Sequence, residues 1–171
     1  MNRISKITLL FLSLIFISFG NLKAQAEIVN LTPTYAAENE GWLVNIEEAY
    51  QISKTTGKPI LANFTGSDWC GWCKRLTKDV FVHQEFKDWA VKNVVLVELD
   101  FPRGKFIPDN IKAQNNSLAG TLQVGGYPTI YVFNLKKDEI SNQYSIETLG
   151  KTGYASSVEQ FTSGVDQMLK R

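Results

Sequence analysis

Residues 60–74, ILANFTGSDWCGWCK, place a short apolar run directly before the two cysteines of the chain, Cys70 and Cys73. The run is mostly apolar and is followed by Thr-Gly-Ser, a pattern typical of a buried strand. Apolar residues then recur with helical spacing from Cys70 onward, and Ser67 or Asp68 is the expected N-cap. The stretch therefore predicts a strand that leads at once into a helix with both thiols in its first turn.

Two cysteines this close could hold a metal ion, close a structural disulfide or exchange disulfides with another molecule. A structural zinc site needs four ligands, and the chain offers two cysteines and one histidine, His83. A structural disulfide stabilises a fold mainly by closing a long loop, whereas Cys70 to Cys73 spans four residues. We therefore interpret the pair as redox-active, a use that requires no metal and no organic cofactor.

The order of the two thiols assigns them different roles. The first lies at the helix start, where free backbone N–H groups and the helix dipole favour its thiolate. The second lies one turn later on the same face, within reach of the first. Cys70 is thus the expected nucleophile, and Cys73 the thiol that resolves the mixed disulfide. Lys74 and Arg75 add positive charge and Asp68 opposes it, so the direction of electron flow stays open.

The N-terminal residues 1–26 have the pattern of a cleaved secretory signal peptide. Basic Arg3 and Lys6 precede an apolar run at 7–19 and an Ala-Gln-Ala ending. The run is shorter than the roughly 18 residues that a membrane-spanning helix requires. We expect a periplasmic or secreted protein with no stable membrane insertion after cleavage, the alternative being an uncleaved membrane anchor.

Cleavage after Ala26 leaves 145 of the 171 residues, enough for one domain. We expect an extended lead-in at 27–40 and a single domain at 41–171. The leader carries three basic residues and no acid, so its loss takes the net charge from +1 to −2. Because neither sign dominates, neither a nucleic acid nor an anionic membrane is indicated as a partner.

Periodicity and turn residues predict the remaining elements. Helices are expected at 45–56, 70–80, 82–90, 109–123 and, from a capping box at 156–159, up to 169; strands are expected at 60–64, 94–99, 129–133 and 144–149. The alternation indicates an α/β fold, with a central mixed β-sheet flanked by helices and an antiparallel edge.

Four motifs together resemble the thioredoxin superfamily: FTGSDWCGWCK (64–74), VELDFPRGK (97–105), AQNNSLAG (113–120) and GYPT (126–129). Within it the chain is similar to exported bacterial thioredoxin-like thiol:disulfide oxidoreductases, relatives of the soluble thiol domains of DsbD. The resemblance covers residues 41–171 and implies a thioredoxin fold. It also implies two kinds of partner, disulfide-containing protein substrates and a redox partner such as a DsbD-type membrane electron transporter.

The resemblance implies roles for individual residues. Cys70 and Cys73 match the redox pair of the family, and Trp69 matches the tryptophan that shields it. Pro128 matches the cis-proline that faces the disulfide. The backbone of Tyr127 would then be free to pair with an incoming peptide strand.

One position departs from the family pattern. Thioredoxin keeps a buried aspartate on the strand before the motif, which exchanges a proton with the resolving cysteine. The matching position here is Asn63, or Phe64 in a shifted alignment, and neither side chain titrates. The possible proton relay is therefore Glu98, Asp100 or water, although both acids could instead be solvated groups at a strand end.

We expect an extracytoplasmic oxidoreductase that reduces the disulfides of substrate proteins through its CGWC pair. Trp69, Trp72, Tyr127 and Pro128 are the expected substrate-binding residues, with Trp72 exposed on the docking surface. One alternative is a disulfide oxidase or isomerase. Another is a non-catalytic peptide-binding module or chaperone that uses the groove beside Pro128.

Overall fold

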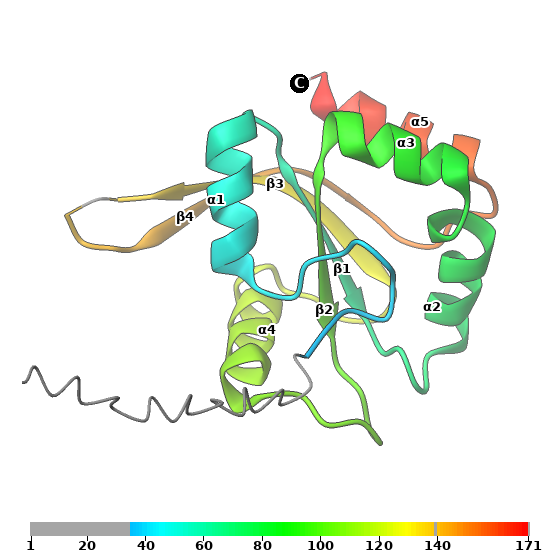
Figure 1. Cartoon of the computed structure of the whole chain (residues 1–171), viewed down its shortest axis with the longest axis horizontal. Coiled ribbons are helices and arrows are strands. Elements are labelled where there is room, and N and C mark those ends of the chain that lie inside the picture. The colour runs from blue at the N-terminus through cyan, green and yellow to red at the C-terminus, as the bar shows by residue number, and fades with distance from the viewer. Residues whose placement is uncertain (1–34, 139, 171) are drawn as a thin grey trace, which may run out of the picture. The chain divides into compact units, whose positions relative to one another are not determined.

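The computed structural model describes residues 35–138 and 140–170, so the predicted signal peptide lies outside the described residues. Four strands form one sheet in the order β2-β1-β3-β4 (Figure 1). β1 (Ile60–Thr65) pairs in parallel with β2 (Val95–Asp100) and antiparallel with β3 (Thr129–Lys137). β4 (Tyr144–Thr152) is an antiparallel edge strand on β3. The predicted mixed sheet with an antiparallel edge is confirmed.

The described helices also follow the predicted order. They are α1 (Ile46–Thr56), α2 (Gly71–Leu76) with a π-helical turn η1 (Thr77–Phe81), α3 (Gln84–Asn93), α4 (Asp109–Thr121) and α5 (Val158–Leu169). Asn45 caps α1 by accepting bonds from two backbone N–H groups, and Gly57 ends it with a φ of 71°. Within the described ranges, no helix is long and apolar enough to cross a membrane.

Helices cover both faces of the sheet, and each face has its own apolar core (Figure 1). One core joins α1 and α4 to the side chains of Ala62, Phe64 and Val97. The other joins α2, η1, α3 and α5 to Leu61 and the opposite side chains of the sheet. Because side chains alternate along a strand, every second residue of β1 and β2 belongs to the same face.

The structure corrects several predicted boundaries. The cap of α2 is Cys70, and the cap of α5 is Ser157 rather than Ser156. α4 ends two residues earlier than predicted, where Gln123 adopts a left-handed φ of 52° and the Val124 N–H bonds to the Ala119 carbonyl. β3 and β4 are longer than predicted because their mutual hydrogen bonds continue into an exposed hairpin. Its residues are not buried, so the sequence there lacks the apolar pattern that marks a strand. The hairpin projects beyond α1 in Figure 1.

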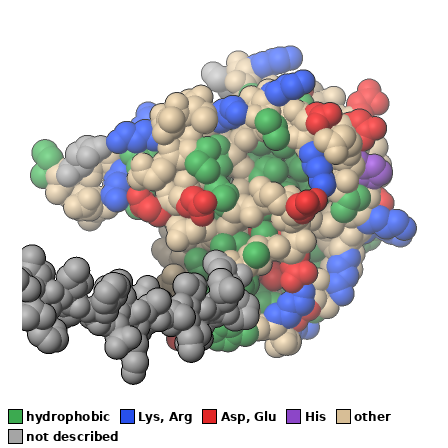
Figure 2. All heavy atoms as spheres, in the orientation of Figure 1, with side chains coloured by type: hydrophobic (Ala, Val, Ile, Leu, Met, Phe, Trp, Pro, Cys, Tyr) green, Lys and Arg blue, Asp and Glu red, His purple; other side chains and the backbone are tan. Residues whose placement is uncertain are grey.

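Charged side chains of both signs cover the exterior. On the face shown in Figure 2, basic and acidic side chains are interspersed rather than gathered by sign. Four pairs of such side chains form ion pairs in the described ranges, including Lys87 with Glu40 and Lys105 with Glu38. Exposed pairs of this kind contribute at most about 1 kcal/mol each, so the two cores are the main source of stability.

Candidate active site

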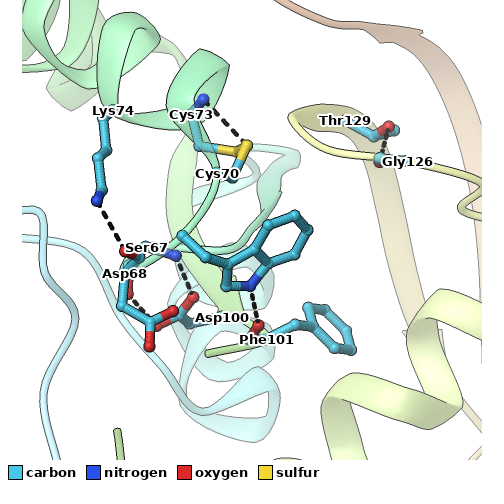
Figure 3. The surroundings of a disulfide bond; sticks show 10 residues. Ser67, Asp68, Cys70, Cys73, Lys74, Asp100, Phe101, Gly126 and Thr129 are labelled. Atoms are coloured by element: carbon cyan, nitrogen blue, oxygen red, sulfur yellow. Dashed lines mark hydrogen bonds between the residues drawn. A yellow bond between two sulfur atoms is a disulfide. The ribbon is translucent and has the colours of Figure 1, made fainter. Parts of the chain in front are cut away.

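Cys70 and Cys73 form a disulfide at the start of α2, with their Cα atoms 5.3 Å apart (Figure 3). The Sγ of Cys70 accepts a hydrogen bond from the backbone N–H of Cys73 at 3.2 Å. A sulfur in this position faces the free N–H groups of the helix start, which stabilise a thiolate once the pair is reduced. The side chains of both cysteines are buried, so exchange requires a partner to approach closely.

The side chains of the loop before Cys70 bond to the end of β2 and the segment after it, while Lys74 of α2 donates to the Asp68 carbonyl at 2.7 Å. The backbone N–H and hydroxyl of Ser67 both donate to Asp100, at 2.8 and 2.5 Å. The Asp68 carboxylate accepts from the backbone N–H groups of Arg103 and Gly104. The bond from Gly104 is the main reason that the pKa of Asp68 is lowered. Since both side chains are engaged elsewhere, Cys70 takes the capping position for which they were predicted.

Trp69 lies beside the disulfide in a fixed orientation. Its indole N–H donates to the Phe101 carbonyl at 2.9 Å, and its ring makes a T-shaped contact with the Tyr127 ring at a centroid distance of 5.8 Å. A Cβ on Gly66 would come within 2.5 Å of the same ring, so only glycine fits below it. The side chain is nevertheless 37% exposed, and the free part is available to a partner.

Trp72 is the more exposed tryptophan of the motif, at 55%. Its ring packs against Tyr154 at 5.0 Å, and the guanidinium of Arg75 lies over it at 5.2 Å. The guanidinium of Arg103 lies over Trp69 at 4.0 Å. The sequence places the loop 103–108 on the docking surface with Trp72 and Tyr127, but it gives no sign that Arg103 itself stacks on Trp69. Tyr154 was not identified as a site residue, because it meets Trp72 from a segment distant in the chain.

The peptide bond between Tyr127 and Pro128 is cis. The hydroxyl of Thr129 donates to the Gly126 carbonyl at 2.8 Å, in the loop across from the disulfide in Figure 3. Tyr127 also packs against Phe101 at 5.3 Å, and burial raises the pKa of its phenol. This loop and Trp69 therefore share one packed surface next to the cysteines.

Glu98 is buried on β2, where it is the register partner of Asn63. Its carboxylate accepts the backbone N–H of Glu38 at 2.7 Å and the side-chain amide of Asn39 at 2.5 Å. Burial raises its pKa above the usual range for a glutamate, although these hydrogen bonds oppose the shift. Asn39 belongs to the predicted lead-in, and no sequence signal connected it to Glu98.

A cavity of about 220 Å³ is lined by both Glu98 and Cys73. Its other walls include Asn39, Thr77 and Lys74, so it is polar and large enough to hold water. Asp100 lines a different cavity and directs both carboxylate oxygens at Ser67. The structure thus brings Glu98, and not Asp100, to the cavity beside Cys73.

Of two further polar residues, Asn63 lies beside Glu98 in the sheet, whereas His83 lines a different cavity from Cys73. The Oδ1 atom of Asn63 is buried and has no hydrogen-bond partner in the part of the chain that the structure describes. His83 is exposed at the start of α3, with its ring contacting the Lys78 carbonyl at 3.1 Å. Within residues 35–138 and 140–170, no group of three or more His, Cys, Asp or Glu residues is placed to hold a metal ion.

Comparison with known proteins agrees with this geometry. Residues 41–134 match the family model described as thioredoxin-like. The chain belongs to this family. This thioredoxin-like protein is 31% identical over 137 residues to the disulfide bond reductase DsbH of Chlamydia pneumoniae, covering 80% of this chain and 81% of that protein. It is 30% identical over 141 residues to the thioredoxin-related protein DsbJ of the same organism, covering 78% of this chain and 40% of that protein.

A solved structure supports the same assignment. The structure of a DsbH oxidoreductase is similar with a TM-score of 0.64 and 29% sequence identity, covering 79% of this chain and 88% of that chain. Together with the Cys70–Cys73 pair, these relatives show that the thioredoxin-like protein is a thiol–disulfide oxidoreductase. The predicted thioredoxin fold and reaction class are confirmed.

Proposed function

We propose that this oxidoreductase works outside the cytoplasm and reduces the disulfides of substrate proteins through Cys70 and Cys73. The observation that carries the proposal is the position of Cys70, whose Sγ caps α2 between two exposed tryptophans. A thiolate stabilised there, beside an aromatic surface, suits attack on a disulfide in another protein. The name of the DsbH relative, a disulfide bond reductase, favours the reductive direction.

The proposed reaction has two exchange steps. The Cys70 thiolate attacks one sulfur of the substrate disulfide, forms a mixed disulfide and releases the other substrate sulfur as a thiolate. The Cys73 thiol loses its proton and attacks the Cys70 sulfur, which closes the protein disulfide and releases the second substrate thiolate. Two electrons pass to the substrate, and a dithiol donor must return them. A DsbD-type membrane transporter is the donor that the family resemblance suggests.

Glu98 is the proposed acceptor of the Cys73 proton. Both residues line the same polar cavity, so a proton can pass between them directly or through water. A raised pKa makes Glu98 a stronger base than an exposed glutamate. The side chain thereby supplies from β2 the titratable group that Asn63 cannot supply from β1.

Trp69, Trp72, Tyr127 and Pro128 form the proposed substrate-binding surface. Trp69 and Tyr127 pack against each other, and both tryptophans keep exposed ring area for a partner. Aromatic rings of this kind contribute large contact area at small entropic cost. The signal-peptide pattern of residues 1–26 supports a periplasmic or secreted location.

Insulin reduction with dithiothreitol as electron donor tests the proposal. The purified protein should accelerate precipitation of the insulin B chain, and Cys70→Ser should abolish the acceleration. Cys73→Ser should instead accumulate a mixed disulfide through Cys70, which non-reducing gels and mass spectrometry would identify. Full activity of Cys70→Ser would refute the proposal.

A reduction potential separates a reductase from an oxidase. Equilibration with glutathione should give a value near that of thioredoxin, about −270 mV, rather than about −120 mV as in a strong oxidant. A reduction potential near that of the strong oxidant would mean that the protein oxidises its substrates, although exchange would still occur through Cys70 and Cys73.

A further inference from the structure

Two arginines lie over the two tryptophans that flank the disulfide. Arg103 stacks on Trp69 at 4.0 Å, and Arg75 lies over Trp72 at 5.2 Å. Stacking holds each guanidinium against a ring while its N–H edge stays available to a carboxylate. Both arginines are exposed, and neither forms an ion pair within the described ranges. The redox site is therefore bordered by two positioned and unneutralised cations.

The charge around the disulfide is mainly positive. We define the rim as residues 66–75, 101–104, 125–129 and 152–156, which hold the cysteines or contact the tryptophans. The rim contains three cations, Lys74, Arg75 and Arg103, and one carboxylate, Asp68. The rim therefore carries an excess of positive charge.

Carboxylates in or beside the rim are already engaged, and Asp100 accepts two hydrogen bonds from Ser67. Asp68 accepts three hydrogen bonds from the backbone N–H groups of Arg103 and Gly104, which offset its charge. Asp79, on the turn after α2, accepts the hydroxyl of Tyr154 at 2.7 Å. Neither carboxylate forms an ion pair with Arg75 or Arg103 in the described ranges.

We propose that the rim selects substrate segments in which acidic side chains lie next to the reactive cysteine. The inference rests on the proposed reductase function and names the class of substrate that this site prefers. An extended segment that places its cysteine at Cys70 brings the neighbouring residues onto Trp69 and Trp72. Carboxylates there meet the guanidinium edges, whereas lysines at the same positions are repelled.

The expected preference follows from the strength of exposed charge pairs. Each arginine should raise the rate for an acidic substrate relative to a basic one by about three- to fivefold. Both arginines together should raise this ratio by on the order of tenfold. The preference should weaken at high ionic strength, because the Debye screening length falls to about 3 Å at 1 M salt.

Single-turnover kinetics with matched peptides test the inference. Reduced protein is mixed with glutathione mixed disulfides of the peptides Glu-Glu-Cys-Glu and Lys-Lys-Cys-Lys, and tryptophan fluorescence reports closure of the protein disulfide. The two thiols of the protein supply both electrons, so each mixed disulfide becomes two thiols as Cys70–Cys73 forms. Dividing each rate by the rate with dithiothreitol removes the difference in intrinsic reactivity between the peptides.

The acidic peptide should react on the order of tenfold faster than the basic one after this correction. The ratio of acidic to basic rates should fall to near one in the double variant Arg75→Gln, Arg103→Gln. It should largely persist in the double variant Arg75→Lys, Arg103→Lys, which keeps both positive charges. Lys136→Gln, a cation of the β3–β4 hairpin, is the matched control and should keep the full ratio.

Equal corrected rates for the two peptides would overturn the inference while leaving the reductase function intact. An acidic preference that survives in the double glutamine variant would also overturn it, because the arginines would not be its source. If wild type reduces neither peptide faster than Cys70→Ser does, the reductase function fails, and the inference fails with it.

Discussion

The two faces of strands β1 and β2 begin alike and end differently. On the face toward α1 and α4 the side chains stay apolar along the whole length: Ile60, Ala62, Phe64, Val95, Val97 and Leu99. On the face toward α2 the first positions are apolar and the later ones polar: Leu61, Leu96, then Asn63, Thr65, Glu98 and Asp100. Buried polar groups cost free energy unless they are hydrogen-bonded, so this face depends on the bonds that Glu98 and Asp100 accept.

The contrast teaches that the group proposed for the chemistry and the continuous apolar core lie on opposite faces of the same two strands. Neighbours in sequence such as Glu98 and Leu99 are both buried, yet one lines the cavity beside Cys73 and the other belongs to an apolar core. A substitution on the apolar face should change only the free energy of unfolding. On the polar face Glu98 should change the reaction, whereas Asp100 and Asn63 should change stability. Four variants test this division.

Leu99→Ala should have the largest effect. Removing a fully buried leucine side chain should lower the free energy of unfolding by about 2–5 kcal/mol, because it leaves a cavity in the core. Chemical denaturation of the oxidised protein measures the loss. The pH dependence of disulfide exchange should stay as in wild type, and a shift in that profile would show that the two faces are not independent.

Glu98→Gln should slow the resolution of the mixed disulfide by on the order of a hundredfold near neutral pH, or about 2.7 kcal/mol of activation free energy. Glu98 accepts a proton only when ionised, so the wild-type rate should rise with pH through its raised pKa and then level off. The variant should lack this rise until Cys73 itself ionises. Rapid-quench analysis of the mixed disulfide measures the rate.

The matched control for Glu98 is Glu85→Gln, an exposed acid in the first turn of α3. It should leave the rate unchanged. If Glu98 acted only through its charge, its removal would favour the Cys73 thiolate and speed the reaction. A faster Glu98→Gln would therefore exclude the proton-transfer role.

Asp100→Ala should have a smaller effect, confined to stability. It removes both acceptors of Ser67, which should cost about 1–3 kcal/mol of unfolding free energy and loosen the loop before Cys70. Denaturation and amide exchange at Ser67 measure these changes. A pH profile altered as strongly as that of Glu98→Gln would assign Asp100 to the proton relay instead.

Asn63→Val should have the smallest effect and the opposite sign. The Oδ1 atom of Asn63 is buried without a hydrogen-bond partner in the described residues, so its removal should stabilise the protein by about 1 kcal/mol. Thermal unfolding measures the gain. A loss of stability would indicate that a bound water satisfies this atom.

Much of the fold could be predicted because its signals are local. The helix at 46–56 has Asn45 and Gly57 at its ends, and the apolar run before Cys70 marks the central strand. The hairpin of β3 and β4 extends further than predicted, since its outer residues are held by cross-strand hydrogen bonds without burial. The cap of α2 was assigned wrongly because Ser67 and Asp68 bond to residues more than thirty positions away.

The sequence by itself determined the redox pair and the strand and helix that carry it. These depend on spacing, periodicity and turn residues, which act over a few positions. Only the tertiary structure decided that Glu98 reaches the cavity of Cys73, and that Arg103 lies over Trp69. The position of Glu98 depends on the register of β2, and its burial there raises its pKa. The position of Arg103 depends on a contact between segments that are distant in the chain.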